Sequence, residues 1–463
     1  MKFVLVQAPF KNFAVTSPPL GLAYLAAVLK NKPAGAEVSV IDANVARLSV
    51  ERTAQRILDM KPDVLGMTMT SPLAAGSFDI IERVKSKVDI PVLAGGPHPT
   101  IMPEDVLKQS KVDIVVRGEG EETIAELCDY FRTAKDIASI KGISFKDGDK
   151  VLHNADRPLI QDMDRLPFPA WELFPLEQYS SIAGRGRLSV PVMTSRGCPF
   201  RCIFCYKGIF GQTYRSRSPQ SVMRELRYLA DTLKIREFSF VDDSFAVDEA
   251  RAIGICDEMI KSGLRLPWRL ANGIAVRSSS SRLFMKAKEA GCYQVSIGVE
   301  SGNQGVLNHI EKGVTLDEIR QTFILAKEAG LETIAFFMIG NLGETEETME
   351  QTVDFAIRLD PDFAQFTIAT PYPGTKMREI IRKEGELLSD NWEKYVSCSG
   401  NAVFRHKELE PGLMKKKYRE AYRRFYLRPG YIIKRLKKIA TMRGLKSGLE
   451  GISLLFKMAL GRR

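Results

Sequence analysis

Residues 194–206 read TSRGCPFRCIFCY and follow an apolar, strand-like run from Leu188 to Met193. Their three cysteines, Cys198, Cys202 and Cys205, have the spacing C-x3-C-x2-C. Soft thiolate ligands bind iron–sulfur clusters or zinc. A structural zinc site is closed by four ligands, but no second cysteine pair is present and the four histidines are remote in sequence: His98, His153, His309 and His406. The loop therefore predicts a 4Fe-4S cluster with one iron left open.

Length and composition predict a soluble protein of at least two domains. The chain has 463 residues, more than one ordinary core holds, and these are 44% hydrophobic and 27% charged. The cysteines outside the loop show no paired pattern, so they are interpreted as core residues in a reducing compartment: Cys128, Cys256, Cys292 and Cys398. No signal peptide precedes the first predicted strand, and no apolar run is long enough to span a membrane. The expected location is the cytoplasm.

Positive charge is concentrated in the C-terminal tail. Residues 412–463 hold 16 Lys or Arg and two Glu, whereas the whole chain has a net charge of +11. From Ile432 to Leu460, apolar residues recur at helical spacing among the basic ones. Such a basic amphipathic helix is typical of peripheral contact with the inner face of an anionic membrane. The alternative is a solvated basic face packed on the rest of the protein. No recognition module accompanies the charge, so nucleic acid is not an expected partner.

The first 135 residues predict a doubly wound parallel sheet. Apolar strand-like runs alternate with amphipathic helical runs, a pattern typical of parallel α/β folds. The predicted strands are 2–8, 37–42, 63–69, 91–94 and 112–116. Ligands of such flavodoxin-like sheets bind beyond the carboxyl ends of the strands, where the loops contain Thr70, Ser71, Gly95 and Gly96. No G-x-G-x-x-G motif or P-loop favours a nucleotide.

A linker over residues 136–187 is expected to join this sheet to a second α/β domain over residues 188–376. Its Pro-rich and aromatic stretch, LPFPAWELFP at 166–175, predicts a strap packed between domains. In the second domain, strands alternate with helices and predict a partial (β/α)6 TIM-like barrel: 188–193, 237–241, 268–272, 294–299, 333–339 and 363–369. Ser218 is the expected N-cap of a helix that begins at Pro219. Residues 377–463 form a helical, basic C-terminal region.

Barrels of parallel strands carry their chemistry at the carboxyl ends of the strands. Here the candidate residues at those ends are Asp242, Asp243, Asn272, Glu300, Ser301 and Gly340. Two adjacent carboxylates are unusual in a core, although Asp243 or Ser244 is equally interpreted as a helix N-cap. Tyr372, after the sixth strand, is interpreted as a substrate contact or as a residue that packs a turn, and the turn is favoured.

The cysteine loop, with Phe204 before its last cysteine, resembles the signature loop of the radical S-adenosylmethionine (SAM) superfamily. The resemblance implies that the open iron binds the amino and carboxylate groups of SAM, with Phe204 as part of the cofactor site. It also implies that an electron from an external flavodoxin or ferredoxin cleaves SAM to methionine and a 5′-deoxyadenosyl radical.

The same resemblance implies roles for the strand ends. Asp242 and Asp243 would face the ammonium group of SAM, Asn272, Glu300 and Ser301 its other polar groups, and Gly340 its adenine. The chain departs from the family pattern in two places. Ala275 and Arg277 stand where an Arg and an Asp are usual, and Leu342 stands where Pro is common.

The first third resembles the cobalamin-binding domain that is fused to one branch of this superfamily. In that domain the loops after the third and fourth strands line the pocket for the nucleotide tail, which here implies Thr70, Ser71, Gly95 and Gly96. The motif D-x-H-x-x-G, which supplies an axial histidine in other cobalamin proteins, is absent after the first strand. Cobalamin is therefore expected to bind without a histidine ligand, and His98 is interpreted as a loop hydrogen bonder. The alternative is a sheet that no longer binds cobalamin.

Together these resemblances imply a cobalamin-dependent radical SAM enzyme that methylates an unactivated carbon of a lipid-like or other small-molecule substrate. The second hypothesis is ring closure or carbon–carbon bond formation on a lipid, isoprenoid or tetrapyrrole. A methylthiotransferase is disfavoured because that branch has extra cluster cysteines in its N-terminal domain, where this chain has only Cys128. A non-catalytic scaffold with a residual cluster is the remaining alternative.

Overall fold

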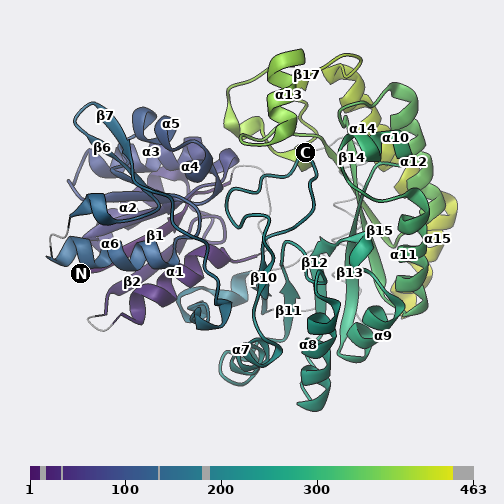
Figure 1. Ribbon diagram of the computed structural model, residues 1–463, viewed down its shortest axis with the longest axis horizontal. Helices are drawn as coiled ribbons and strands as arrows, with labels where there is room; N and C mark the ends of the chain where they lie inside the picture. The colour runs from purple at the N-terminus through teal and green to yellow at the C-terminus, as the bar shows by residue number, and fades with distance from the viewer. Residues whose placement is uncertain (11–16, 33–34, 134–135, 180–187, 442–463) are drawn as a thin grey trace.

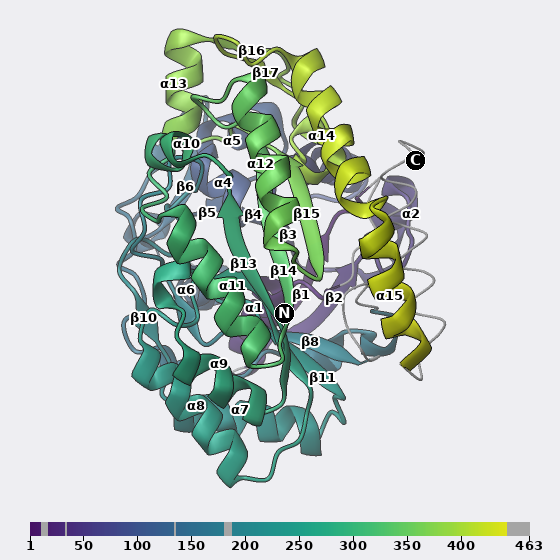
Figure 2. The ribbon, with the colours of Figure 1, turned by 90° about the vertical axis from the view of Figure 1, so that its right-hand side faces the viewer.

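The computed structural model describes residues 1–10, 17–32, 35–133, 136–179 and 188–441. Two sheets of mainly parallel strands lie next to each other, with the N-terminal sheet at the left of Figure 1 and the barrel at the right. The C-terminal helices α14 (Pro411–Tyr426) and α15 (Pro429–Thr441) run along the barrel, as Figure 2 shows.

The N-terminal sheet has the strand order β2-β1-β3-β4-β5-β6-β7, and β1 to β5 are parallel, as predicted. The parallel strands are β1 (Lys2–Gln7), β2 (Glu37–Asp42), β3 (Val64–Thr68), β4 (Val92–Gly95) and β5 (Ile114–Val116). The helices between and after them are α1 (Leu20–Lys30), α2 (Val50–Met60), α3 (Ala74–Lys85), α4 (Pro97–Ile101), α5 (Pro103–Gln109) and α6 (Glu121–Thr133). Successive side chains of a strand point to opposite faces. Phe3 and Leu5 therefore join the core that continues into the barrel, whereas Val4 and Val6 join a separate core on the other face.

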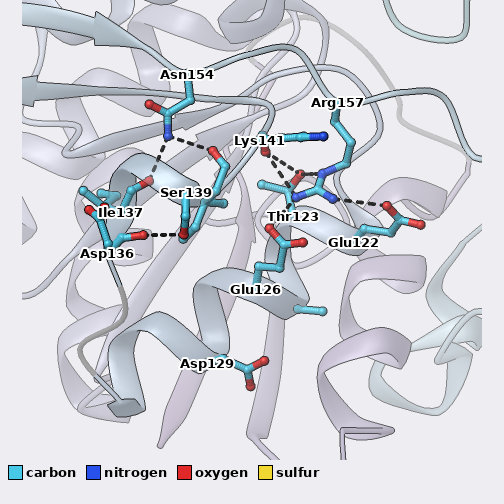
Figure 3. Close-up of polar contacts among 12 residues, drawn as sticks. Glu122, Thr123, Glu126, Asp129, Asp136, Ile137, Ser139, Lys141, Asn154 and Arg157 are labelled. Atoms are coloured by element: carbon cyan, nitrogen blue, oxygen red, sulfur yellow. Dashed lines mark hydrogen bonds and ion pairs between the residues drawn. The ribbon is translucent and has the colours of Figure 1, made fainter.

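The sheet extends beyond the boundary predicted from the sequence. Strands β6 (Ile143–Asp147) and β7 (Lys150–His153) form an antiparallel hairpin beside β5, so residues 143–153 belong to the sheet and not to a linker. The chain that follows is tied back to α6. Arg157 donates to Thr123 Oγ1 at 2.8 Å and pairs with Glu122 at 3.2 Å (Figure 3). Hydrogen bonds from Asn154 to two carbonyls of the turn before β6 complete this anchor.

The strap predicted between the domains contacts both of them. Trp171 is fully buried, and next to it Ala170 N donates to Ala23 O of α1 at 3.0 Å. On the barrel side, Asp164 Oδ1 accepts from Ser218 N at 2.9 Å. The strap and the residue pair before it thus contact both domains, through one backbone hydrogen bond and one to a side-chain carboxylate.

The barrel sheet has the order β15-β14-β13-β12-β11-β8, with all six strands parallel. Its strands are β8 (Ser189–Val192), β11 (Glu237–Phe240), β12 (Trp268–Ile274), β13 (Cys292–Glu300), β14 (Glu332–Ile339) and β15 (Phe363–Ile368). Its helices are α7 (Pro219–Asp231), α8 (Glu249–Lys261), α9 (Ser281–Glu289), α10 (Gln304–His309), α11 (Leu316–Glu328) and α12 (Glu346–Leu359). Ser218 is the N-cap of α7, as predicted. The N-cap of α8 is Asp248, so neither Asp243 nor Ser244 has that role.

The C-terminal region adds α13 (Lys376–Glu384), β16 (Glu386–Leu387), β17 (Phe404–Arg405), α14 (Pro411–Tyr426) and α15 (Pro429–Thr441). Helix α14 packs on α12 and on the edge strand β15 (Figure 2). The first part of the basic tail is therefore packed on the barrel, and residues 442–463 lie outside the described residues. Within the described ranges, none of the helices combines the length and the apolar character needed to cross a membrane.

Candidate active site

The three cysteines lie on an irregular loop between two short strands that pair with each other, β9 (Ser195–Arg196) and β10 (Arg215–Ser216). Cys198 and Cys202 are half-buried, and Cys205 is exposed. Gly197 begins the loop with a φ of +84°, and a Cβ there would lie 2.2 Å from the carbonyl oxygen of Thr213. Only glycine fits this position, so the turn that presents Cys198 depends on the residue before it.

The middle of the loop is held by two backbone hydrogen bonds. Ile203, between the second and third cysteines, donates its N–H to Ile310 O at 3.1 Å and accepts at its carbonyl oxygen from Met377 N at 3.0 Å. The Ile203 side chain is buried in the main core, and Phe204 packs against the same core. Segments that follow β13 and β15 thus hold the part of the loop that carries Cys202 and Cys205.

Two lysines place positive charge beside the thiols. A hydrogen bond from Cys205, with the charges of Lys312 and Lys207, lowers the pKa of Cys202 to about 7, although burial raises it. The thiolate is the form that binds metal. No group of three His, Cys, Asp or Glu side chains in the described part of the chain is placed to hold a single metal ion. A cluster takes each thiolate on a different iron, so three cysteines on one loop, with two lysines to offset negative charge, fit a 4Fe-4S cluster.

Three of the residues predicted to bind SAM have polar side chains at the carboxyl ends of the barrel strands. Asp243 accepts from Gly197 N at 3.0 Å, which ties it to the start of the cysteine loop. Asn272 donates to the Val241 carbonyl at 2.6 Å, and both Asp243 and Asn272 are exposed. Glu300, with a φ of +67°, pairs with Lys312 at 2.8 Å. These three residues and the cysteine loop form one polar surface.

Asp242 does not face this surface, contrary to the prediction. Its side chain is 2% exposed. The carboxylate accepts from Thr194 N at 2.6 Å and from Ser195 Oγ at 2.8 Å, and it also accepts from the Thr194 hydroxyl. Burial raises the pKa of Asp242. The residue therefore anchors the segment that leads into the cysteine loop and has no oxygen turned toward a ligand.

Ser301 also differs from its predicted role. Ser301 is fully buried, and its hydroxyl is 3.1 Å from Thr352 Oγ1 of α12. A Cβ on Gly340 would lie 2.4 Å from Met414 Sδ of α14. The φ of +82° at Gly340 favours glycine, and its contact with adenine stays a prediction.

The carboxyl edge of the N-terminal sheet presents bare backbone. Gly96 has a φ of +98°, and a Cβ there would lie 2.9 Å from Met69 O. A Cβ on Gly95 would be in ordinary van der Waals contact with the Val116 carbonyl oxygen at 3.7 Å. Thr70 beside them is exposed. A bulky, flat-sided group can approach such an edge closely, and the three residues therefore fit the nucleotide tail of cobalamin.

Ser71, the fourth residue predicted for this pocket, is buried against His98. The Ser71 hydroxyl lies 3.2 Å from His98 Nδ1, and burial lowers the pKa of His98 to about 4. The ring also packs edge-on against Trp392 at 5.3 Å between centroids. His98 is thus a neutral loop hydrogen bonder, as interpreted from the sequence, and it joins the N-terminal sheet to the C-terminal region.

Several residues of the site were missed by the sequence analysis. Lys207 follows the last cysteine by two positions, a local signal that could have been used. Lys312 and Trp392 have no motif of their own, and only the fold brings them to Glu300 and His98. Tyr372 donates its hydroxyl to the Tyr395 carbonyl at 2.9 Å, which agrees with its interpretation as a turn-packing residue.

The protein has two adjoining α/β domains, one with a three-cysteine loop and one with a glycine-lined strand edge. These features define the class of enzymes that pair an iron–sulfur cluster with a second, bulky cofactor. Residues 8–128 match the family model of the B12 binding domain, and residues 192–356 match that of the radical SAM superfamily. A protein of Pyrococcus horikoshii described as an uncharacterized methyltransferase is 36% identical to the chain over 94% of each. The anaerobic magnesium-protoporphyrin IX monomethyl ester cyclase of Rubrivivax gelatinosus is 30% identical over 90% of this chain and 75% of the cyclase.

The chain belongs to the family of radical SAM enzymes that carry a B12-binding domain. Among solved structures, the radical SAM methyltransferase TsrM of Kitasatospora setae, with tryptophan and a SAM analogue bound, is similar with a TM-score of 0.70 at 20% identity, over 93% of this chain and 90% of that one. OxsB with aqua-cobalamin and SAM bound gives a TM-score of 0.77 at 17% identity, over 99% of this chain and 71% of that one. At the level of family, the predicted enzyme class and the three predicted cofactors are confirmed: cobalamin, a 4Fe-4S cluster and SAM.

Proposed function

We propose that the protein replaces a hydrogen on an unactivated carbon of a small-molecule substrate with a methyl group. The cluster and one SAM would supply the radical that removes the hydrogen, and cobalamin would supply the methyl group, which a second SAM restores. The chain binds and orients these groups. Asp243, Asn272 and Glu300 are proposed for SAM, and Thr70, Gly95 and Gly96 for the cobalamin tail.

The observation that carries the proposal is that the carboxyl edges of the two sheets face each other. Two residues lie within 3.3 Å of the position that a Cβ of Gly374 would take. They are Tyr206, next to the last cluster cysteine, and Ile101, at the end of the helix that follows β4. Glu119, just after β5, pairs with Arg196 of the cysteine loop at 2.9 Å. A substrate held at this boundary would be within reach of both cofactor sites, which a transfer between them requires.

The first test is anaerobic reconstitution of the full chain with iron, sulfide and hydroxocobalamin. After reduction by dithionite, or by a flavodoxin or ferredoxin as the external donor, SAM with a deuterated methyl group is added together with either a lipid extract or an aqueous cell extract. Formation of 5′-deoxyadenosine and S-adenosylhomocysteine, with the label on a carbon of an extracted molecule, is the expected result. Both products should be lost in Cys202→Ala. A chain that retains no cobalamin would contradict the proposal.

The alternative is ring closure or carbon–carbon bond formation with the same cofactors. It is favoured by the 30% identity to an anaerobic cyclase of a magnesium porphyrin ester. A ring closure consumes no methyl group. It would therefore give 5′-deoxyadenosine in the presence of an extract, without S-adenosylhomocysteine and without label transfer.

We further propose a lipid-like substrate and peripheral contact of the C-terminal helices with an anionic membrane. Ile432 and Ile433 of α15 are 37% and 53% exposed, and the basic residues Lys434 and Arg435 follow them. Apolar and basic groups together favour binding to anionic lipid surfaces. Co-sedimentation with phosphatidylglycerol vesicles, lost in high salt and in the double variant Ile432→Ser and Ile433→Ser, is the expected outcome. Equal binding to phosphatidylcholine vesicles, or none to either, would contradict it.

A further inference from the structure

A buried network of four charged side chains crosses the boundary between the two domains. Glu119 accepts from Arg196 at 2.9 Å and from Arg215 at 3.0 Å on each of its oxygens. Glu121 pairs with the second terminal nitrogen of Arg196. None of the four side chains is more than 9% exposed. Two carboxylates and two guanidinium groups therefore balance each other away from water.

The network connects the N-terminal domain to both ends of the cysteine loop. Glu119 and Glu121 lie just after β5, on the loop and first residue that begin α6. Arg196 and Arg215 lie opposite each other in the short antiparallel strands β9 and β10. All three cysteines lie between these two arginines in the sequence. One carboxylate, that of Glu119, thus holds the two ends of the loop together.

Further contacts hold the side chains of this network in place. The second oxygen of Glu119 also accepts from Ile160 N at 2.6 Å, so the segment that leads into the strap shares the same carboxylate. The Arg196 guanidinium lies over the rings of Tyr24 and Phe210, at 5.5 Å and 4.9 Å from their centroids. A buried charge that loses its partner is strongly unfavourable. The ends of the loop cannot separate without leaving at least one such charge unpaired.

We propose that Glu119 and Glu121 are positioning residues for the iron–sulfur cluster. The cluster site is completed across the domain boundary, because the B12-binding domain supplies the carboxylates that hold the cysteine loop in its binding conformation. This inference rests on the binding of a cluster by Cys198, Cys202 and Cys205. It goes beyond the site predicted from the barrel alone, since every cluster residue predicted from the sequence lies in the second domain.

The test compares Glu119→Gln and Glu121→Gln in the full chain, reconstituted anaerobically with iron and sulfide. The readouts are iron and labile sulfide per chain and the electron paramagnetic resonance spectrum of the reduced cluster, with and without SAM. Glu119→Gln is expected to lose most of its iron and the change in the spectrum that SAM causes. Glu121→Gln removes a single ion pair and is expected to lose a smaller share of its iron. If circular dichroism shows that Glu119→Gln does not fold, Glu121→Gln is the variant that tests the proposal.

Two matched variants separate positioning from general loss of stability. Glu122→Gln changes the next residue of α6, which pairs with Arg157 of the anchor (Figure 3). Glu225→Gln breaks an equally buried pair, Glu225 with Arg217, within the barrel domain. Both are expected to keep the cluster, even where Glu225→Gln lowers the melting temperature.

Full iron and an unchanged spectrum in folded Glu119→Gln and Glu121→Gln would overturn the proposal, as would an equal loss of iron in Glu225→Gln. These readouts need no substrate and no cobalamin. Glu119→Gln could lose its iron as expected while the wild-type protein never transfers a methyl group. That result would contradict the proposed function and leave this inference standing.

Discussion

Gly197 shows how one residue sets the geometry of the cluster loop. A Cβ there would meet the Thr213 carbonyl at 2.2 Å, and the φ is +84°. Because the obstacle is backbone, Gly197→Ala is expected to displace the loop, lower the iron content after reconstitution and destabilise the chain by more than the ~1 kcal/mol of a positive φ alone. Gly263→Ala is the control, since Gly263 has a φ of +70° with open space around it. Similar effects of both variants on iron content would show that the close contact is unimportant.

Lys312 is expected to set the reduction potential of the cluster. Its ammonium group pairs with Glu300 at 2.8 Å and occupies the space where a Cβ of Gly298 would lie, at 2.8 Å. A positive charge near a cluster favours the reduced, more negative state. Lys312→Gln should therefore make the midpoint potential more negative in a redox titration followed by electron paramagnetic resonance. Lys288→Gln, at an exposed lysine of α9, should leave it unchanged. An unaltered potential in Lys312→Gln would contradict this role.

Glu344 predicts a pH dependence of stability. Its Oε2 accepts from Gly340 N at 2.7 Å and Asn341 N at 2.9 Å, and burial raises its pKa to about 8. In the unfolded chain the carboxyl has its ordinary pKa near 4.5. The folded state therefore binds a proton that the unfolded state has lost, and the free energy of unfolding falls as the pH rises between these two values.

Replacing Glu344 with Gln removes this dependence, because the amide keeps an acceptor and does not ionise. Urea denaturation at about pH 5, 7 and 8.5 should show Glu344→Gln gaining stability relative to the wild type as the pH rises. Glu328→Gln, at an exposed position of α11, should follow the wild-type profile. A parallel profile for Glu344→Gln would mean that Glu344 is ionised in the folded chain.

At the scale of elements, helix α14 closes the open edge of the barrel sheet with tyrosine hydroxyls. Tyr422 accepts from Phe366 N and donates to Phe366 O, at 3.2 and 3.0 Å, and Tyr426 does the same for Ala364, at 3.0 and 2.7 Å. Four helical residues advance about 6 Å, and two strand residues advance about 6.6 Å. The two spacings match, so alternate residues of β15 find hydroxyl partners. The backbone groups of this edge strand, which could otherwise pair with another chain, are therefore hydrogen-bonded at Ala364 and Phe366.

Tyr422→Phe should be costly because it leaves both backbone groups of Phe366 unpaired. Each buried unpaired group costs about 1–3 kcal/mol, so we expect a loss of roughly 2–6 kcal/mol in urea denaturation. Tyr431→Phe removes a bond to only one backbone group, Asp362 O, and should cost less. Equal losses in the two variants would show that the second hydrogen bond adds nothing.

Elements with strong local signals were predictable from the sequence. The parallel strands alternate with amphipathic helices, and Ser218 followed by Pro219 marks the start of α7. The hairpin β6–β7 was missed because its strands are short and depend on the edge of β5 for pairing. The packing of α14 was also missed. The spacing of Tyr422 and Tyr426 acquires a meaning only once β15 is known to be an edge strand.

The site was predictable where chemistry is local and unpredictable where it depends on distant partners. Three cysteines and the glycines of a strand edge are visible in one stretch each. Which of two adjacent carboxylates turns inward is decided by Thr194 and Ser195, which bind Asp242 from another strand end. Likewise, the pairing of Glu119 with Arg196 joins positions 77 residues apart, and no local pattern announces it.

At the scale of the whole molecule, the C-terminal region connects the two domains a second time. Trp392 packs on His98, just after β4, while the Arg378 guanidinium of α13 lies 5.2 Å from the centroid of its ring. The segment around Trp392 contacts residues 71–73, which include Ser71. The loop after β3 therefore lies between the N-terminal sheet and a segment that follows the barrel, next to the edge proposed to hold the cobalamin tail.

Trp392→Ala should loosen this contact without unfolding either domain, since the ring is only half-buried. Loss of its packing leaves the loop at residues 71–73 free to open. We expect faster amide hydrogen exchange there and weaker binding of hydroxocobalamin, whereas exchange in β13 at the centre of the barrel should not change. Trp392→Phe retains an aromatic ring and should restore most of the protection. Leu388→Ala, at an exposed position of the same region, should have no effect. If Trp392→Ala leaves exchange at residues 71–73 unchanged, the strap and the Glu119 network suffice to hold the domains together, and the C-terminal contact has no part in forming the cobalamin edge.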